Sequence, residues 1–240
     1  MGVLLMALAI GVGTGAVCFA FLEPIEAIFP ALAVFGLSYF LLARRIAKQL
    51  QAGMEAVQKE MMKGQNHIDR AIQLLEALKV KFGKLQFFAS SSIDAQIGTI
   101  YFMKQDFEKA KPYLERSFVR VWHARTMLAV LLAKKKDYVK MDQVMEQAAK
   151  YSGKQGLMWS IWAYLHWKAG EKEKAIQVLL RGQEALKDAD PHLAANLLAL
   201  QNGKKMKMKP YGDQWYQFHL EQHPQVRQAQ RGGHVRFARR

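Results

Sequence analysis

The N-terminal residues combine length with a lack of charge, which leaves this part of the chain few ways to fold. Residues 3–22, VLLMALAIGVGTGAVCFAFL, are all uncharged. As a helix they reach about 30 Å, enough to cross the hydrocarbon core of a bilayer. A second, shorter apolar run occupies residues 27–43. Between the two lies EPIE, where Pro24 disfavours helix continuation and two carboxylates keep the bend in water. The pattern predicts a transmembrane helical hairpin over residues 1–44.

Two other interpretations of this hairpin stay open. The first is a signal peptide, although such a peptide normally begins with basic residues. This chain has none before Arg44, and a second apolar run follows the first within a few residues. The other alternative is a long helical hairpin buried in the protein. Gly11 and Gly15 follow the small-xxx-small pattern, which can bring two helices close together.

Charge is divided sharply along the chain. All 35 lysine and arginine residues lie from Arg44 onward, with 18 of the 20 acidic residues, so this part carries an excess of 17 positive charges. Such an excess favours anionic partners, whether lipid headgroups, nucleic acid or acidic protein surfaces. Arg44, Arg45 and Lys48 directly follow the second apolar run, while the loop between the runs has no basic residue. By the positive-inside rule, we expect these three at the membrane surface and the rest of the chain in the cytoplasm. A bacterial inner membrane is the expected location.

A helix–break–helix pattern recurs in the middle of the chain. Its first copy is residues 97–117, IGTIYFMKQDFEKAKPYLERS, with helical apolar spacing on both sides of a break at residues 104–106. The second copy starts 31 residues later, at residue 128, and the third copy starts 34 residues after the second, at residue 162. Small residues recur at one position of each first helix, namely Gly98, Ala129 and Ala163. A period of 31 to 34 residues with two helices in each is typical of a solenoid of stacked helix pairs.

This pattern resembles the tetratricopeptide repeat (TPR) family. The residues that carry the resemblance are Ile97, Gly98, Tyr101, Phe107 and Ala110 in the first copy and Trp159, Ala163, Gly170 and Ala175 in the third. The second copy departs from the family pattern at Met141, and the third at His166 and Lys172. The resemblance implies a TPR-like α-solenoid of about four helix pairs. Together with the two transmembrane helices predicted from the apolar runs, the expected fold class is all-α.

Weaker units flank the three clear copies. An amphipathic helix continues from the second apolar run, and Asn66 is expected to cap the helix after it. Together these form a linker helix and degenerate repeat over residues 45–87. The TPR-like repeats are expected over residues 88–205. Residues 206–240 are expected to hold a basic tail and a capping helix, which begins at Asp213 and stops before Pro224.

The TPR resemblance also implies a binding surface. In that family the first helix of each pair lines a groove that receives a peptide or a helix. Transferred onto this chain, the lining residues are Thr99, Phe102, Met103, Thr126, Val130, Lys134, Ser160, Tyr164, Trp167 and Lys168. We expect this apolar, aromatic and basic surface to take a protein partner that offers a hydrophobic or acidic helix or strand. Alternatively, residues 213–220, DQWYQFHL, fold back and fill the groove.

No motif for catalysis or for a cofactor is found in the sequence. It has no nucleophile elbow, no phosphate-binding glycine loop and no zinc-finger spacing, and a single cysteine, Cys18, excludes an internal disulfide. His219 and His223 lie four residues apart, as two metal ligands on one helix can, but no third ligand accompanies them. We therefore expect no enzymatic activity, no cofactor and no metal.

The favoured function is that of a membrane-anchored adaptor or scaffold, which localises or assembles a protein partner at the cytoplasmic face of a membrane. One alternative is a structural subunit of a large membrane machine, held mainly by its hairpin. The other is a membrane-tethered nucleic-acid-binding protein, because a basic tail can contact phosphates in RNA as well as in lipid headgroups. The arginines of that tail are Arg227, Arg231, Arg236, Arg239 and Arg240.

Overall fold

The chain folds into helices grouped in two compact units. The computed structural model describes residues 2–21, 23–86 and 88–222, and within these ranges it contains helices and no strands. One unit holds the residues up to Ile100 with residues 116–118, and the other holds residues 101–115 and those from Val119 onward. The expected segments 1–44 and 45–87 therefore belong to one unit, and segment 88–205 is shared between the two. The predicted all-α class is confirmed.

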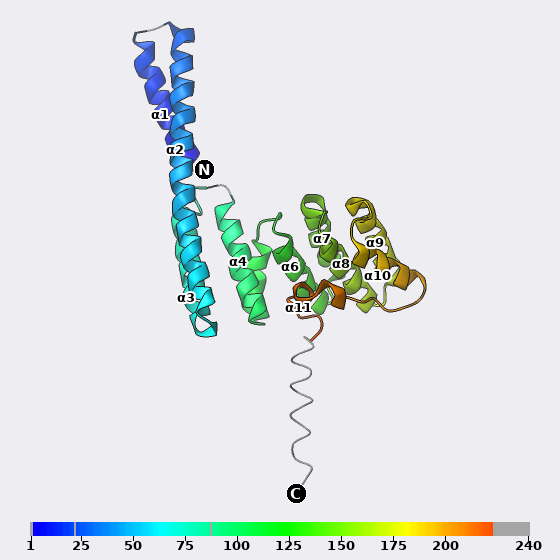
Figure 1. Ribbon diagram of the computed structural model, residues 1–240. Coiled ribbons are helices and arrows are strands. Elements are labelled where there is room, and N and C mark those ends of the chain that lie inside the picture. Colours follow the sequence, from blue (N-terminus) through cyan, green and yellow to red (C-terminus); the bar gives the residue numbers. More distant parts are fainter. Residues whose placement is uncertain (1, 22, 87, 223–240) are drawn as a thin grey trace. The chain divides into compact units, whose positions relative to one another are not determined.

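Two long helices form the hairpin of the first unit. Helix α1 spans Gly2–Phe19 and helix α2 spans Pro24–Met62, and they lie side by side (Figure 1). The proline stands in the first turn of α2, where a helix needs no N–H donor.

Small residues on α1 bring the two helices of the hairpin together. A Cβ added to Gly11 would lie 2.8 Å from Cβ of Phe35, and one added to Gly15 would lie 3.2 Å from Cβ of Ala31. These two glycines therefore serve the contact between the chain's own two helices.

Most apolar side chains of the hairpin point outward. In the most apolar stretches of the two helices, only 17% and 6% of the residues are buried. Phe21 and Phe29 are 85% and 73% exposed. Both helices are long and apolar enough to cross a membrane. The exposure of their side chains counts against the alternative of a hairpin buried in the protein.

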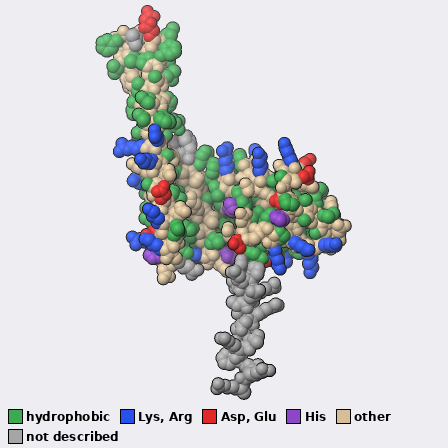
Figure 2. All heavy atoms as spheres, in the orientation of Figure 1, with side chains coloured by type: hydrophobic (Ala, Val, Ile, Leu, Met, Phe, Trp, Pro, Cys, Tyr) green, Lys and Arg blue, Asp and Glu red, His purple; other side chains and the backbone are tan. Residues whose placement is uncertain are grey.

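Helix α2 continues without a break from its apolar half into a polar half. At 39 residues it is about 58 Å long. Figure 2 shows lysine and arginine side chains beginning where the hydrophobic surface of the hairpin ends. The polar half packs against α3, Ile68–Phe82, and Val57 and Leu75 are buried there.

The start of α3 differs from the expectation. The cap predicted at Asn66 is wrong, because that residue lies within a short 3₁₀ turn, Gln65–His67. His67 takes the N-cap position and makes no side-chain capping hydrogen bond. The tighter turn delays the start of the helix to Ile68.

Helices of 9 to 15 residues build the second unit. Figure 1 shows α6 to α10 side by side. The helices are α4, Ala89–Met103, whose last residues belong to this unit; α5, Phe107–Glu115; α6, Trp122–Lys134; α7, Tyr138–Ser152; α8, Gly156–Lys168; α9, Lys172–Leu186; and α10, Pro191–Gln201.

The same turn ends α4, α6, α8 and α10. A residue with positive φ follows each of these helices, namely Gln105, Lys136, Gly170 and Gly203. The next N–H then donates to a carbonyl five residues earlier, as from Glu171 to His166 at 3.0 Å. This geometry satisfies carbonyls at the helix end, as in a Schellman motif. The turns recur at intervals of 31, 34 and 33 residues, which confirms the predicted helix–break–helix period.

The residues after Gly203 are largely irregular. A 3₁₀ turn, Lys209–Tyr211, precedes α11, which spans only Asp213–Tyr216. The expected capping helix from Asp213 to Pro224 is therefore wrong in length. His219 has a φ of 50°, a left-handed conformation that an α-helix of L-residues does not pass through. Pro224 lies outside the described residues.

Replacing Gly182 by valine is expected to destabilise the second unit. A Cβ at this position on α9 would lie 2.8 Å from Cβ of Trp159 and 3.0 Å from Cδ1 of Leu193, so α8 and α10 would have to move. Overpacking of this kind costs about 1 to 3 kcal/mol, which lowers the melting temperature measured by circular dichroism in detergent. Glu184→Val, an exposed change on the same helix, is the control. Equal melting temperatures for the two variants would contradict this packing.

Candidate functional site: the face covered by the C-terminal segment

Residues 204–222, called the C-terminal segment below, lie across one face of the second unit. Trp215 and Phe218 of this segment are fully buried. The Trp215 ring packs edge-on against Tyr164 of α8, with 4.8 Å between centroids, and Phe218 lies 6.4 Å from Trp122 of α6. Figure 1 shows α11 beside these helices. Of the two occupants considered for the groove, the structure contains the chain's own C-terminal residues.

An asparagine holds the C-terminal segment by its backbone. Asn196 on α10 is only 2% exposed. Its Oδ1 accepts a hydrogen bond from the N–H of Lys207 at 2.7 Å, and its Nδ2 donates to the carbonyl of Lys207 at 3.2 Å. Met206 and Met208, on either side, are buried. Because both bonds use main-chain groups, this contact accepts any residue except proline.

Two tyrosine hydroxyls make further polar contacts. The hydroxyls of Ser160 and Tyr211 lie 2.7 Å apart, and Tyr211 also donates to the Asp190 carboxylate at 3.3 Å. Tyr164 donates to Oε1 of Glu221 at 3.2 Å. Burial raises the pKa of both tyrosines, and the nearby carboxylates raise it further. The hydroxyls therefore stay protonated, as hydrogen-bond donation requires.

Half of the predicted groove residues are covered. The residues with at most 1% exposure are Phe102, Thr126, Val130, Ser160 and Tyr164. Phe102 lies 5.6 Å from the ring of His219, which is part of the C-terminal segment. Ser160 and Tyr164 also contact this segment, so a partner can reach these three side chains only when the segment leaves.

The other predicted groove residues remain at least partly accessible. Met103, Lys134 and Lys168 are exposed, and Trp167 is half-buried. Thr99 is half-buried and belongs to the first unit, where its hydroxyl donates to the carbonyl of Ala95 at 2.8 Å.

The two predicted lysines lie over aromatic rings. Nζ of Lys134 is 4.1 Å from the centroid of Phe107, and burial lowers the pKa of Lys134. Nζ of Lys168 is 5.2 Å from the centroid of Trp167 and 5.4 Å from that of Tyr164. Ammonium groups at these distances interact favourably with the ring faces.

The remaining predicted basic residues fall in two places. Arg44, Arg45 and Lys48 are exposed on α2, directly after its apolar stretch. The five tail arginines, and His223 of the histidine pair, lie outside the described residues.

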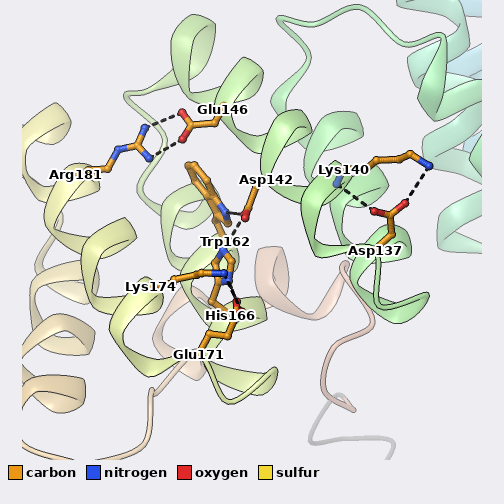
Figure 3. Close-up of polar contacts among 9 residues, drawn as sticks. All are labelled: Asp137, Lys140, Asp142, Glu146, Trp162, His166, Glu171, Lys174 and Arg181. Carbon is orange, nitrogen blue, oxygen red and sulfur yellow. Dashed lines mark hydrogen bonds and ion pairs between the residues drawn. The ribbon is translucent and has the colours of Figure 1, made fainter.

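A polar network joins α7, α8 and α9 (Figure 3). His166, 2% exposed, lies with Nε2 2.8 Å from Oδ1 of Asp142 and with Nδ1 2.7 Å from Oε2 of Glu171. Asp142 also accepts from Nε1 of Trp162 at 2.7 Å. Hydrogen bonds from Lys174 and His166 lower the pKa of Glu171. The departure from the TPR pattern at His166 is thus a cross-link between three helices.

The other contacts of this region are structural as well. Arg181 on α9 forms a two-pronged pair with Glu146 on α7, both bonds being 2.7 Å, and its guanidinium lies 5.2 Å from the centroid of Trp162. Among the described residues, no group of three or more histidine, cysteine or acidic side chains is arranged to hold a metal ion.

Sequence reasoning did not single out the residues that grip the C-terminal segment. Asn196 had a usable signal, since it stands inside the apolar helix sequence PHLAANLLALQ, and a buried amide must find hydrogen-bond partners. Tyr211, in the loop sequence MKMKPYG, had none.

Asp142→Ala is expected to destabilise the second unit by about 1 to 3 kcal/mol, because Trp162 and buried His166 lose an acceptor. Asp137→Ala is the matched control on the same helix. It removes the carboxylate that accepts from the N–H of Lys140 at 3.2 Å, a cap worth about 1 kcal/mol. Thermal melts of both variants make the comparison. If Asp142→Ala melts no lower than Asp137→Ala, the network does not stabilise the unit as described.

Acidification from pH 7.5 to 5.5 is expected to loosen the C-terminal segment. Burial lowers the pKa of His219 below its ordinary 6.5, and the positive charge of Lys134 lowers it further. Released His219 therefore binds protons more readily than docked His219. Neutral His219 therefore favours the docked segment at neutral pH, and this contribution to stability is lost as the pH falls through 6.5. Hydrogen exchange over residues 204–222, corrected for its intrinsic pH dependence, measures this loss.

His219→Gln is the control for the acid effect. This variant should lose less protection on acidification than the wild type. A residual effect is expected because burial also lowers the pKa of His123 on α6. Protection that is independent of pH in the wild type would contradict the prediction.

No family model matches this chain, and a comparison with curated proteins gives no match either. The function therefore has to follow from the hairpin, the covered face and their chemistry.

Proposed function

We propose that the chain is a membrane-anchored adaptor, which binds a protein partner through the face that its C-terminal segment covers. The hairpin of α1 and α2 crosses the membrane, and the polar half of α2 lies in the cytoplasm. The basic residues Arg44, Arg45 and Lys48 support this orientation by the positive-inside rule. A bacterial inner membrane is the proposed location.

One observation supports partner binding above all: the C-terminal segment is held as a peptide ligand would be. It gives main-chain groups to Asn196 and buries two aromatic side chains, Trp215 and Phe218. Peptide-binding surfaces combine backbone hydrogen bonds, which supply affinity, with sites for particular side chains, which supply specificity. A partner segment of the same chemistry can take the place of residues 204–222.

The contacts of the C-terminal segment indicate what such a partner offers. Its two aromatic anchors are three residues apart, and the carboxylate of Glu221 follows three residues later and accepts from Tyr164. The predicted groove also contains two positively charged side chains, Lys134 and Lys168. We therefore propose a partner segment with paired aromatic residues followed by an acidic one.

The regular helix pairs support assignment to the TPR family as an α-solenoid. Four equivalent turns at intervals of 31 to 34 residues match its period. In such an adaptor no bond is made or broken. Its effect is positional, because binding localises or assembles the partner at the membrane.

The C-terminal segment is covalently joined to the face that it covers, which gives it an advantage in binding over any separate partner. A segment joined by a short linker competes at an effective concentration on the order of millimolar. A partner therefore has to bind more tightly than the free segment would, or act when that segment is loosened.

The proposal is tested by competition. Full-length protein in mild detergent captures proteins from membranes, and the wild type is compared with the double variant Trp215→Ala, Phe218→Ala. We expect the double variant to capture more of a defined protein set, and a synthetic peptide of residues 204–222 to displace that set. The same peptide with both aromatic residues replaced by alanine is the control peptide. Val139→Ala, at an exposed site on α7, is the control variant.

Three results would count against the adaptor. Equal capture by all variants, with no displacement by the peptide, contradicts binding at this face. Loss of the captured proteins after nuclease digestion favours the nucleic-acid-binding alternative. If capture requires residues 1–44 and does not change in the double variant, the result favours a subunit held by its hairpin.

A further inference from the structure

We propose that the loop between α3 and α4, residues 83–86 with Phe88, lies on the membrane and places Phe88 in a layer of anionic lipid headgroups. This inference rests on the proposed insertion of the hairpin. It gives the first unit a second membrane contact, in addition to the basic residues of α2.

The loop is attached to the first turn of α1. The N–H of Gly2 donates to the carbonyl of Lys84 at 3.1 Å, and the N–H of Val3 donates to the carbonyl of Leu85 at 3.4 Å. A Cβ added to Gly2 would lie 2.9 Å from Cδ2 of Leu85. These contacts satisfy N–H groups that a helix start leaves without an intrahelical partner. The loop and the start of α1 therefore lie at the same depth.

The length of α1 sets that depth. Its 18 residues span about 27 Å, close to the roughly 30 Å of a hydrocarbon core, so each end of an inserted α1 reaches an interface. The packing of Gly11 on Phe35 and of Gly15 on Ala31 fixes the antiparallel register of the hairpin. This register places the start of α1 near Arg44, where the apolar part of α2 ends.

The loop has the chemistry of a membrane surface contact. Residues 80–86, VKFGKLQ, contain two lysines and no acidic residue, and Lys81 and Lys84 are exposed. Such basic clusters are attracted to anionic lipids. The acidic side chains that flank this stretch along the chain are Glu76, which is half-buried, and Asp94, which is 3% exposed and paired with Lys79 at 2.6 Å.

Phe88 is the apolar part of this contact. Its side chain is 60% exposed, although it stacks on Phe118 with 4.5 Å between centroids. Its φ of 62° is a left-handed conformation that non-glycine residues rarely adopt. Phe88 directly precedes α4, beside the loop that touches α1. An aromatic ring held out at the depth of the headgroups favours lipid as its environment.

The test measures the depth of single fluorescent labels. Full-length Cys18→Ser protein receives one cysteine, labelled with a nitrobenzoxadiazole dye, at Phe88, Met62 or Ile10. It is placed in vesicles of equimolar phosphatidylcholine and phosphatidylglycerol, and brominated lipids serve as quenchers. Met62 is the matched control, because it is 80% exposed in the same unit but lies at the far end of α2. Ile10, in the middle of α1, reports hairpin insertion.

We expect strong quenching at Ile10, clear but weaker quenching at Phe88, and none at Met62. Lys81→Glu with Lys84→Glu should reduce the quenching at Phe88 and leave that at Ile10 unchanged. A label at Phe88 as weakly quenched as one at Met62, with Ile10 still quenched, overturns the loop contact and leaves the anchor standing. Absence of quenching at Ile10 overturns both, because the hairpin is then not in the bilayer.

Discussion

The rest of the structure depends on one unbroken helix. Helix α2 passes from its apolar half into its polar half with no cap, turn or glycine break near Arg44, and its 39 residues span about 58 Å. Its apolar half packs on α1 through Gly11 and Gly15, and its polar half packs on α3. The hairpin and the α3–α4 region therefore belong to one compact unit. In the proposed orientation, a rigid helix, rather than a flexible linker, sets the distance of this unit from the bilayer.

The second unit combines a rigid framework with a bound segment of its own. Buried His166 and the carboxylates around it join three helices, and the turns after four helices repeat nearly the same hydrogen bond. Against this framework lies a segment of little regular structure, held by Asn196, by two hydroxyl contacts and by aromatic packing. Its backbone makes few bonds of its own, so its order comes from the face that it covers. A segment of this kind is well suited to exchange with a partner.

The helices could largely be predicted from the sequence, whereas the turns, the occupant of the groove and the role of the loop could not. The length of the apolar runs and Pro24 predicted the hairpin, and the regular recurrence of small residues predicted the helix pairs, because each of these features acts locally. The left-handed turns at Gln105 and Lys136 carried no such signal, since neither residue is glycine. The occupant of the predicted groove could not be chosen from the sequence, because DQWYQFHL and a partner segment offer the same aromatic and acidic groups. The loop at residues 83–86 gained a role only through the hydrogen bonds of Lys84 with Gly2 and of Leu85 with Val3, each of which joins residues 82 positions apart in the chain.

The central claim is that the bilayer surrounds the first half of α2 and ends near Arg44. A series of single nitroxide labels along α2, in full-length Cys18→Ser protein in vesicles, tests it most directly. At each position, paramagnetic relaxation compares access to dissolved oxygen, which concentrates in lipid, with access to a water-soluble nickel chelate. We expect oxygen-dominated access from Ile28 to Leu41 and a crossover between Ala43 and Lys48. Chelate-dominated access at Ile28 and Leu37, or no crossover along the helix, would contradict it.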